Sequence, residues 1–112
     1  MGGGEGVAEV MESRSALFRP GDWVLPGTAM SGTWCTHKIC ADDTVIGVRN
    51  DISVEGAATL MINPASAFRM LEDYVHLKEG DWLVQNGANS AVGQAVIQIA
   101  KVMILNLSFS QL

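Results

Sequence analysis

The sequence has few cysteines and few basic residues, and it has no long apolar run. No run of apolar residues reaches the roughly 18 residues that a membrane-spanning helix requires. The seven Lys and Arg residues are scattered and the net charge is -5. A nucleic-acid surface needs clustered positive charge, so this distribution argues against one. We therefore expect a soluble protein with no membrane span and no nucleic-acid partner.

The two cysteines, Cys35 and Cys40, lie on either side of His37. Two thiols near a histidine are compatible with either a disulfide or a metal site. A structural zinc site needs further ligands at recognised spacings, and His76 is the one other histidine. We expect reduced, partly buried thiols and no metal.

The first residues contain no targeting segment. Met1-Gly2-Gly3-Gly4-Glu5-Gly6 has no basic region followed by an apolar core, so we expect no secretory signal and no transit peptide in this chain. The content of 48% hydrophobic and 17% charged residues is typical of a globular protein. Since 112 residues are short for the two kinds of structure described below, we expect pieces of two domains.

The front half, residues 1–52, has the pattern of a small β-structure. Turn residues separate short runs of strand-forming residues, and residues 13–18 are left as a loop. Such short strands are typical of small barrels. The predicted strands are residues 7–11, 23–25, 33–40 and 45–48.

Helical signals begin after Asp51. Ser53 can cap a helix over residues 54–61, and Pro64 is expected to stop or kink that helix because proline lacks an amide hydrogen. A second helix is predicted from apolar residues at steps of three and four, so that Tyr74 is expected to pack inside. We expect residues 53–79 to form a helical connector. The apolar stripe of its second helix consists of Ala67, Met70, Leu71 and Tyr74.

A local repeat precedes two of the predicted strands. Phe18-Arg19-Pro20-Gly21-Asp22-Trp23 and Leu77-Lys78-Glu79-Gly80-Asp81-Trp82 share the order apolar, basic, any residue, Gly, Asp, Trp. The surrounding segments are unlike each other. We interpret the repeat as a turn that delivers the chain into a strand, and not as a duplication.

Residues 80–100 form the most informative segment. A buried strand at 83–85 is followed by small or turn-prone residues at 86–93 and then by a helix with one apolar face. Many proteins bind a nucleotide phosphate in this way, because free amides at a helix N-terminus attract an anion. Asn89 and Ser90 lie directly before the helix and can supplement those amides. The alternatives are an ordinary tight turn and a simple N-cap at Ser90.

Asn63-Pro64 is a second candidate. Proline pushes the preceding residue out of helical geometry, which can expose the Asn63 side chain in a cleft. The alternative is a helix break with a solvated asparagine. His37 and His76 have no sequence-local carboxylate or nucleophile that completes a triad.

A set of segments between residues 3 and 101 carries a match to a known family. The most specific segment is residues 85–100, Gln-Asn-Gly-Ala-Asn-Ser-Ala-Val-Gly-Gln-Ala-Val-Ile-Gln-Ile-Ala. With these segments the chain resembles the mitochondrial trans-2-enoyl thioester reductases of the medium-chain dehydrogenase/reductase superfamily. The others are Gly3-Gly4-Glu5-Gly6-Val7-Ala8, Pro20-Gly21-Asp22-Trp23-Val24, Gly32-Thr33-Trp34, Ala57-Ala58-Thr59-Leu60, Asn63-Pro64 and Phe68-Arg69-Met70-Leu71.

The resemblance implies an α/β fold with a β-rich N-terminal part. Residues 1–52 would be a partial GroES-like β domain, residues 53–79 the connector, and residues 80–112 the first β-α segment of a Rossmann domain that binds NADPH. The implied activity is hydride transfer from NADPH to the double bond of a 2-enoyl thioester of acyl carrier protein or CoA, in mitochondrial fatty acid synthesis. A homodimer is also implied.

The resemblance also assigns cofactor-binding residues. Gly93 would let the helix approach the strand closely. Ala91 stands where the family usually has glycine, and its methyl group could crowd the pyrophosphate. The residues that would contact NADPH are Asn63, Asn89, Ser90, Ala91 and Val92.

Two departures from the family lead us to expect a chain that is inactive alone. The proton-donating tyrosine of the family lies upstream of the Gly-Gly-x-Glu-Gly segment, so no catalytic residue is carried over. After Ala100 the family turns through a glycine into a second strand, whereas residues 102–112 contain neither glycine nor a basic residue. We expect an unrelated tail there. The alternatives are a non-catalytic fragment that pairs with a full-length subunit and a product that does not fold stably.

Overall fold

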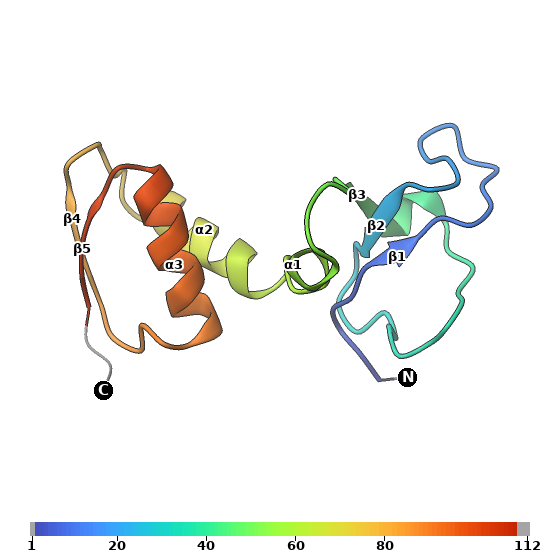
Figure 1. Cartoon of the computed structure of the whole chain (residues 1–112), viewed down its shortest axis with the longest axis horizontal. Helices are drawn as coiled ribbons and strands as arrows, with labels where there is room; N and C mark the ends of the chain where they lie inside the picture. Colours follow the sequence, from blue (N-terminus) through green and yellow to red (C-terminus); the bar gives the residue numbers. More distant parts are fainter. Residues whose placement is uncertain (1, 110–112) are drawn as a thin grey trace. The chain divides into compact units, whose positions relative to one another are not determined.

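The computed structural model describes residues 2–109. They form two compact units, Met1–Met61 (unit 1) and Ile62–Leu112 (unit 2), which Figure 1 shows in sequence colours. Residues 110–112 of the predicted Rossmann segment lie outside the described residues. In the part that is described, every helix is too short or too polar to cross a membrane.

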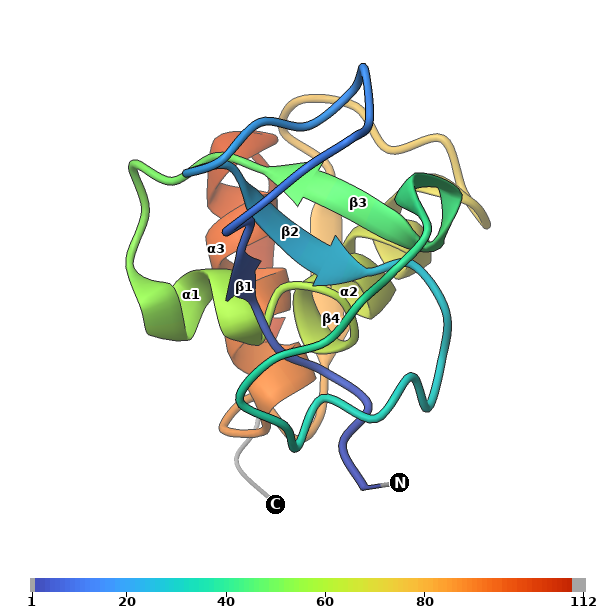
Figure 2. The ribbon, with the colours of Figure 1, turned by 90° about the vertical axis from the view of Figure 1, so that its right-hand side faces the viewer.

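Unit 1 contains an antiparallel sheet in the order β1-β2-β3. Its strands are β1 (Ala8–Glu9), β2 (Trp23–Pro26) and β3 (Val45–Val48), and a short 3-10 helix, η1 (Asp42–Thr44), leads into β3. Figure 2 shows β2 between its two neighbours. The predicted strands at 23–25 and 45–48 are confirmed, whereas β1 is shorter than the predicted 7–11.

The predicted strand at 33–40 is wrong. The segment has no strand or helix, and its first amides bond to the N-terminal glycines, with Thr33 N 3.3 Å from Gly3 O and Trp34 N 3.2 Å from Gly2 O. Ile39 is fully exposed and Trp34 is 86% exposed. The run is apolar enough for a strand, but its large apolar side chains are mostly exposed, so burial does not hold it in a sheet.

The repeated Gly-Asp-Trp pattern forms the same turn twice, as predicted. In the first copy the Asp22 amide lies 3.1 Å from Arg19 O, and the Asp22 carboxylate accepts the Arg19 amide at 2.7 Å. In the second copy the Asp81 amide lies 3.0 Å from Lys78 O, and the Asp81 carboxylate accepts the Lys78 amide at 2.8 Å. The glycine before each aspartate has a positive φ, 91° and 87°, which this turn requires. Each turn delivers a tryptophan into a strand.

Two helices occupy the predicted connector. Helix α1 (Val54–Ala58) is capped by Ser53 as predicted, since the Ser53 hydroxyl accepts the Gly56 amide at 3.0 Å. Helix α1 ends before Pro64 is reached. Pro64 lies in the first turn of helix α2 (Asn63–Glu72), where a missing amide hydrogen leaves no bond unmade. Pro64 therefore begins a helix instead of stopping one.

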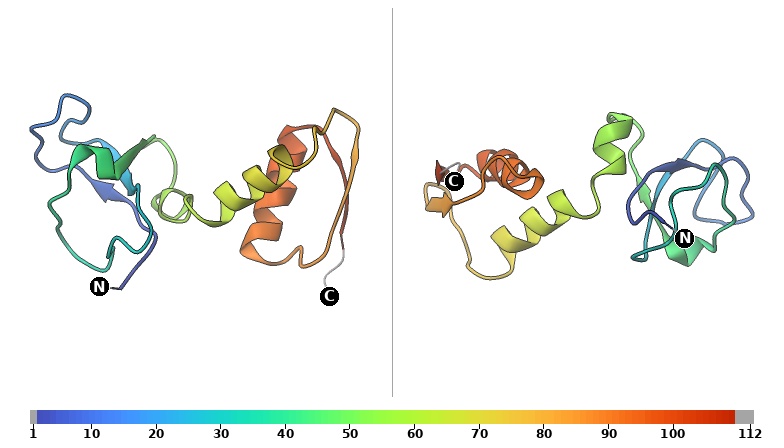
Figure 3. Two further views of the ribbon diagram at one scale, coloured as in Figure 1. Left: turned by 180° about the vertical axis from the view of Figure 1, so that it is seen from behind. Right: turned by 90° about the horizontal axis from the view of Figure 1, so that it is seen from below.

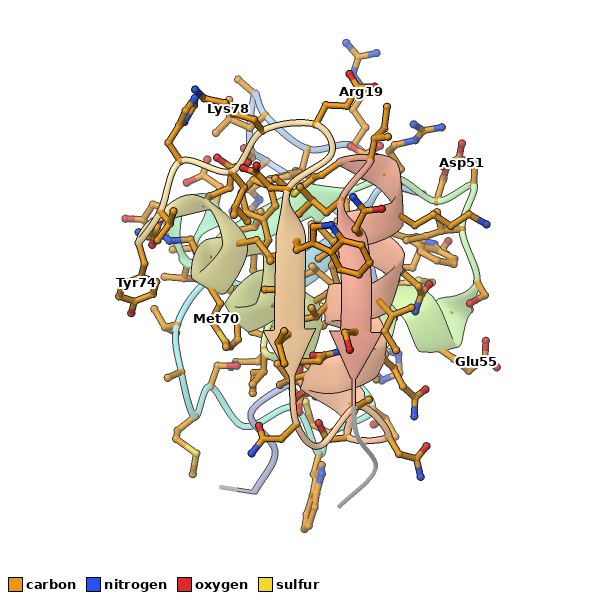
Figure 4. The ribbon with its side chains drawn as sticks, turned by 90° about the vertical axis from the view of Figure 1, so that its left-hand side faces the viewer. Arg19, Asp51, Glu55, Met70, Tyr74 and Lys78 are labelled. Atoms are coloured by element: carbon orange, nitrogen blue, oxygen red, sulfur yellow. The ribbon has the colours of Figure 1, made fainter. Side chains whose placement is uncertain are left out.

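Half of the predicted apolar stripe on α2 is buried. Ala67 is fully buried and Leu71 is 4% exposed, whereas Met70 is 57% and Tyr74 80% exposed. Tyr74 lies beyond the last residue of α2, and Figure 4 shows its side chain pointing away from the fold. The prediction that Tyr74 packs inside is wrong, because the helix ends before it completes the turn that would bury this residue.

Unit 2 is a β-α-β arrangement with α2 packed on it. Strand β4 (Trp82–Gln85) leads through a loop into helix α3 (Ala91–Val102), and β5 (Asn106–Phe109) then returns parallel to β4. Figure 4 shows the two strands side by side with α3 behind them, and Figure 3 shows the strand pair beside α3. The segment after residue 101, expected to be an unrelated tail, therefore supplies a second strand that the sequence did not predict. The core cluster of this unit is Ala67, Leu71, Ala95 and Val96.

The turn from α3 into β5 is made without glycine. The Leu105 amide lies 2.9 Å from Ala100 O and the Ile104 amide 3.3 Å from Lys101 O, which is the Schellman pattern that ends many helices. Its left-handed position is filled by Ile104 with φ 58°. Glycine usually occupies this position, and its absence is why the sequence did not indicate a second strand.

We expect Ile104→Gly to stabilise unit 2 by about 1 kcal/mol, because a left-handed residue with a β-carbon costs roughly 1–2 kcal/mol and part of the gain is lost to the greater freedom of unfolded glycine. Little burial is lost, since Ile104 is 59% exposed. Urea unfolding followed by circular dichroism measures the change. Val102→Gly is the control, because Val102 is 82% exposed and lies within α3, with no left-handed strain to relieve; equal stabilisation by both variants would contradict the account.

Candidate functional site

The candidate site is the loop between β4 and α3. Gly87, with φ 60°, begins a tight turn in which the Ser90 amide lies 2.9 Å from Gly87 O. Ala88 within the turn is 3% exposed, and Asn89 is exposed. The turn thus anchors one side of the loop in the unit and leaves Asn89 and Ser90 at the surface before the helix.

Ser90 caps α3. Its hydroxyl oxygen accepts the Gly93 amide at 3.1 Å, and its carbonyl accepts the Gln94 amide at 2.8 Å. The amides of Ala91 and Val92 have no acceptor among residues 2–109. These two amides and the Ser90 hydroxyl hydrogen are the donors that the helix start offers to an anion.

Gly93 allows the helix to touch the loop. A β-carbon built on Gly93 would lie 2.5 Å from Gly87 O and 2.8 Å from the Ala88 α-carbon. Both are backbone atoms, so neither can turn aside as a flexible side chain can. The close approach expected at Gly93 is therefore present, and it is made to the loop.

The other predicted residues differ in their surroundings. Ala91 is exposed, whereas the Val92 side chain packs against the core cluster of unit 2. Val92 can therefore offer only its amide outward. Asn63 is the first residue of α2, half-buried, and its side chain makes no hydrogen bond with the described residues. Helices α2 and α3 are inclined to each other, and both begin at their lower end in the view of Figure 1.

Two glutamines take part in the loop, and the sequence did not single them out. Gln94 donates to Asn89 O at 2.9 Å and so holds the loop against the helix. Gln85, the last residue of β4, donates to Gly93 O at 3.2 Å. The helical pattern placed Gln94 on the polar face of the helix, where no contact was expected. The strand pattern treated Gln85 only as the last residue of the strand. A glutamine that ends a strand just before a small-residue loop was the available signal.

The charged residues near this segment lie before the start of β4 and at the end of α3, away from the loop that joins the two elements. Lys78 and Asp81 precede β4, and Lys101 is in the last turn of α3. The clearly shifted pKa values belong to unit 1, where the hydrogen bond between Arg49 and Asp51 raises the pKa of Arg49 and lowers that of Asp51. The hydrogen-bond donors at this helix start are therefore backbone amides and neutral side chains.

The remaining candidates are not residues of the loop. Cys35 and Cys40 are free and exposed, so the expected partial burial is wrong. Tyr74, the one tyrosine of the chain, follows α2 and is exposed. None of these residues contributes to the arrangement around Ser90.

Comparison with known proteins places this geometry in context. No family model matches the chain. A mitochondrial enoyl-acyl-carrier-protein reductase of Xenopus tropicalis is 50% identical over 102 residues, which cover 89% of this chain and 29% of that protein.

Two solved structures match this chain at 36% sequence identity, and each match covers 96% of this chain and 33% of the chain in the solved structure. One is the mitochondrial 2-enoyl thioester reductase Etr1p/Etr2p heterodimer from Candida tropicalis, with a TM-score of 0.86. The other is the Etr1p complex with NADP and crotonyl-CoA, with a TM-score of 0.88. The chain spans 29% to 33% of the length of these relatives. The chain is therefore related to the mitochondrial enoyl thioester reductases of the medium-chain dehydrogenase/reductase superfamily.

Proposed function

We propose that the chain forms part of the NADPH site of an enzyme that transfers a hydride to the double bond of a trans-2-enoyl thioester. One observation carries the proposal: the β4–loop–α3 segment, with two free amides beside the Ser90 cap, lies within the stretch matched to the reductases. The related Etr1p structure holds NADP and crotonyl-CoA, a dinucleotide and a 2-enoyl thioester. Both ligands fit the proposed reaction.

In this proposal each residue has a limited role. The amides of Ala91 and Val92 and the hydroxyl of Ser90 donate to a cofactor phosphate, and the Asn89 side chain supplements them. Asn63, at the start of α2, makes a hydrogen bond to the cofactor as donor or acceptor. Ala91 is exposed, and its methyl group narrows the space for the pyrophosphate relative to glycine.

The assignments to the whole enzyme also belong to the proposal. Residues 1–52 correspond to a partial GroES-like domain, residues 53–79 to the connector, and residues 80–112 to a partial Rossmann domain. The carrier of the substrate is acyl carrier protein or CoA, the place is mitochondrial fatty acid synthesis, and the enzyme is a homodimer. A two-subunit assembly has precedent in the related Etr1p/Etr2p heterodimer.

A second candidate function is a non-catalytic fragment that pairs with a full-length subunit. One face of the β4–β5 pair favours it, because Trp82 is 72% and Val84 78% exposed there. Parallel strands are normally covered on both faces. In this second proposal, an apolar surface of a full-length subunit covers these side chains.

Titration with NADPH, followed by quenching of tryptophan fluorescence, tests the proposal and separates the two candidates. We expect saturable quenching by NADPH and no oxidation of NADPH when crotonyl-CoA is added to the chain alone. Co-purification with a full-length subunit, combined with no quenching at millimolar NADPH, would favour the second candidate. Crotonyl-CoA-dependent oxidation of NADPH by the chain alone would contradict the expected inactivity.

A further inference from the structure

We infer that Gln85 is a positioning residue for the cofactor loop, an inference that rests on the proposed function. Gln85 is the last residue of β4 and is half-buried. Its side-chain Nε2 donates to the carbonyl oxygen of Gly93 at 3.2 Å, across the loop. This hydrogen bond therefore connects the end of β4 directly to the first turn of α3, and the loop connects the same two elements through the backbone.

Gly93 is held on both sides of its α-carbon. Its amide donates to the Ser90 hydroxyl at 3.1 Å, and its carbonyl accepts from Gln85 at 3.2 Å. Its α-carbon also lies against Gly87 and Ala88. The glycine has no side chain to fix its backbone, so these contacts, together with the helical hydrogen bonds of α3, set the direction of the peptide planes in the first turn.

The orientation of that turn decides where the free amides point. The Val92 amide belongs to the peptide unit directly before the one that donates to Ser90. Gly93 lies within α3, so its carbonyl also accepts the helical hydrogen bond from the Ile97 amide. Without the Gln85 bond that carbonyl keeps only its helical partner, so the first turn of α3 is tied less firmly to the end of β4 and the neighbouring donors spread over more directions. A preorganised set of donors binds an anion more strongly than a loose set, because less ordering is left to be done on binding.

The chemistry of Gln85 is specific. Gly93 O is an acceptor, so the residue facing it must be a donor. A carboxylate at this position would repel the carbonyl, and its pKa would be raised above the usual value of about 4.3, because the charged form is disfavoured there. When such a carboxyl group takes up a proton it becomes a donor again. Gln85→Glu therefore converts the hydrogen bond into one that forms only as the pH falls through the raised pKa.

The test measures NADP+ affinity, since the oxidised cofactor survives at low pH. Gln85→Met, which keeps the shape and removes the donor, is expected to weaken NADP+ binding about five- to tenfold, the worth of one hydrogen bond. Gln85→Glu is expected to weaken it more at pH 8 and to return toward the affinity of the unsubstituted chain by pH 5. Each value is compared with the unsubstituted chain at the same pH, at a temperature where circular dichroism shows both folded.

Gln98 supplies the matched control. Its Nε2 donates to Gln94 O at the same 3.2 Å, but on the exposed face of α3. Gln98→Met and Gln98→Glu should leave the affinity unchanged at both pH values. Unchanged binding by Gln85→Met, or a loss in Gln85→Glu that does not depend on pH, overturns the inference. Absence of NADP+ binding by the unsubstituted chain overturns the proposed function and the inference with it.

Discussion

Gly93→Ala is expected to destabilise unit 2 by about 2–3 kcal/mol and to abolish measurable NADPH binding. The added carbon would lie 2.5 Å from Gly87 O and 2.8 Å from the Ala88 α-carbon, and overpacking of this kind forces the backbone to move. Movement of α3 away from the loop also separates Ser90 from the amides that it organises. Urea unfolding measures the first effect and fluorescence titration the second.

Gly4→Ala is the control for this substitution. A β-carbon at Gly4 has its nearest neighbour, Met30 Sδ, at 3.9 Å, an ordinary contact distance. We expect unfolding and binding close to those of the unsubstituted chain. If Gly93→Ala were equally mild, the close approach of helix and loop would not be needed for this fold, and the role given to Gly93 would be wrong.

Ser90→Asp is expected to weaken NADPH binding by at least about 30-fold while leaving α3 intact. Aspartate is as good an N-cap as serine, so the helix should keep its stability. Its carboxylate, however, would stand beside the amides of Ala91 and Val92, where the cofactor phosphate is proposed to bind. Placing like charges together costs several kcal/mol, and each 1.4 kcal/mol is about tenfold in affinity.

The control for the charge is Ser13→Asp. The Ser13 hydroxyl also accepts a backbone amide, that of Ser15 at 3.0 Å, and it lies in an exposed loop of unit 1. The same change in net charge is therefore made outside the proposed site. Equal losses in the two variants would mean that overall charge, and not the Ser90 position, governs binding.

The predictions that succeeded depend on local chemistry. Ser53 and Ser90 cap helices because a serine oxygen reaches an amide three residues on, and the two Gly-Asp turns close through their own aspartates. The strand, loop and helix around residues 83–102 follow from periodicity within one segment, although the predicted burial of the strand is wrong, because Val84 is 78% exposed. These signals need no knowledge of the rest of the chain.

The failures depend on tertiary structure. Residues 33–40 have strand-forming side chains but no partner strand among the described residues. Tyr74 continues the apolar spacing of α2 but follows the helix end. Strand β5 was missed because Ile104 takes a left-handed conformation that glycine usually supplies. The role of Gln85 depends on a contact across eight residues, which no spacing rule indicates.

The most direct test of the central claim is a titration of the isotope-labelled chain with NADPH, followed through its backbone amide resonances. If the loop and helix start bind the cofactor phosphate, the largest saturable shifts will come from Asn89, Ser90, Ala91 and Val92, with a further shift at Asn63. The shifts should follow one dissociation constant. Absence of saturable shifts, or shifts confined to unit 1, would contradict the account.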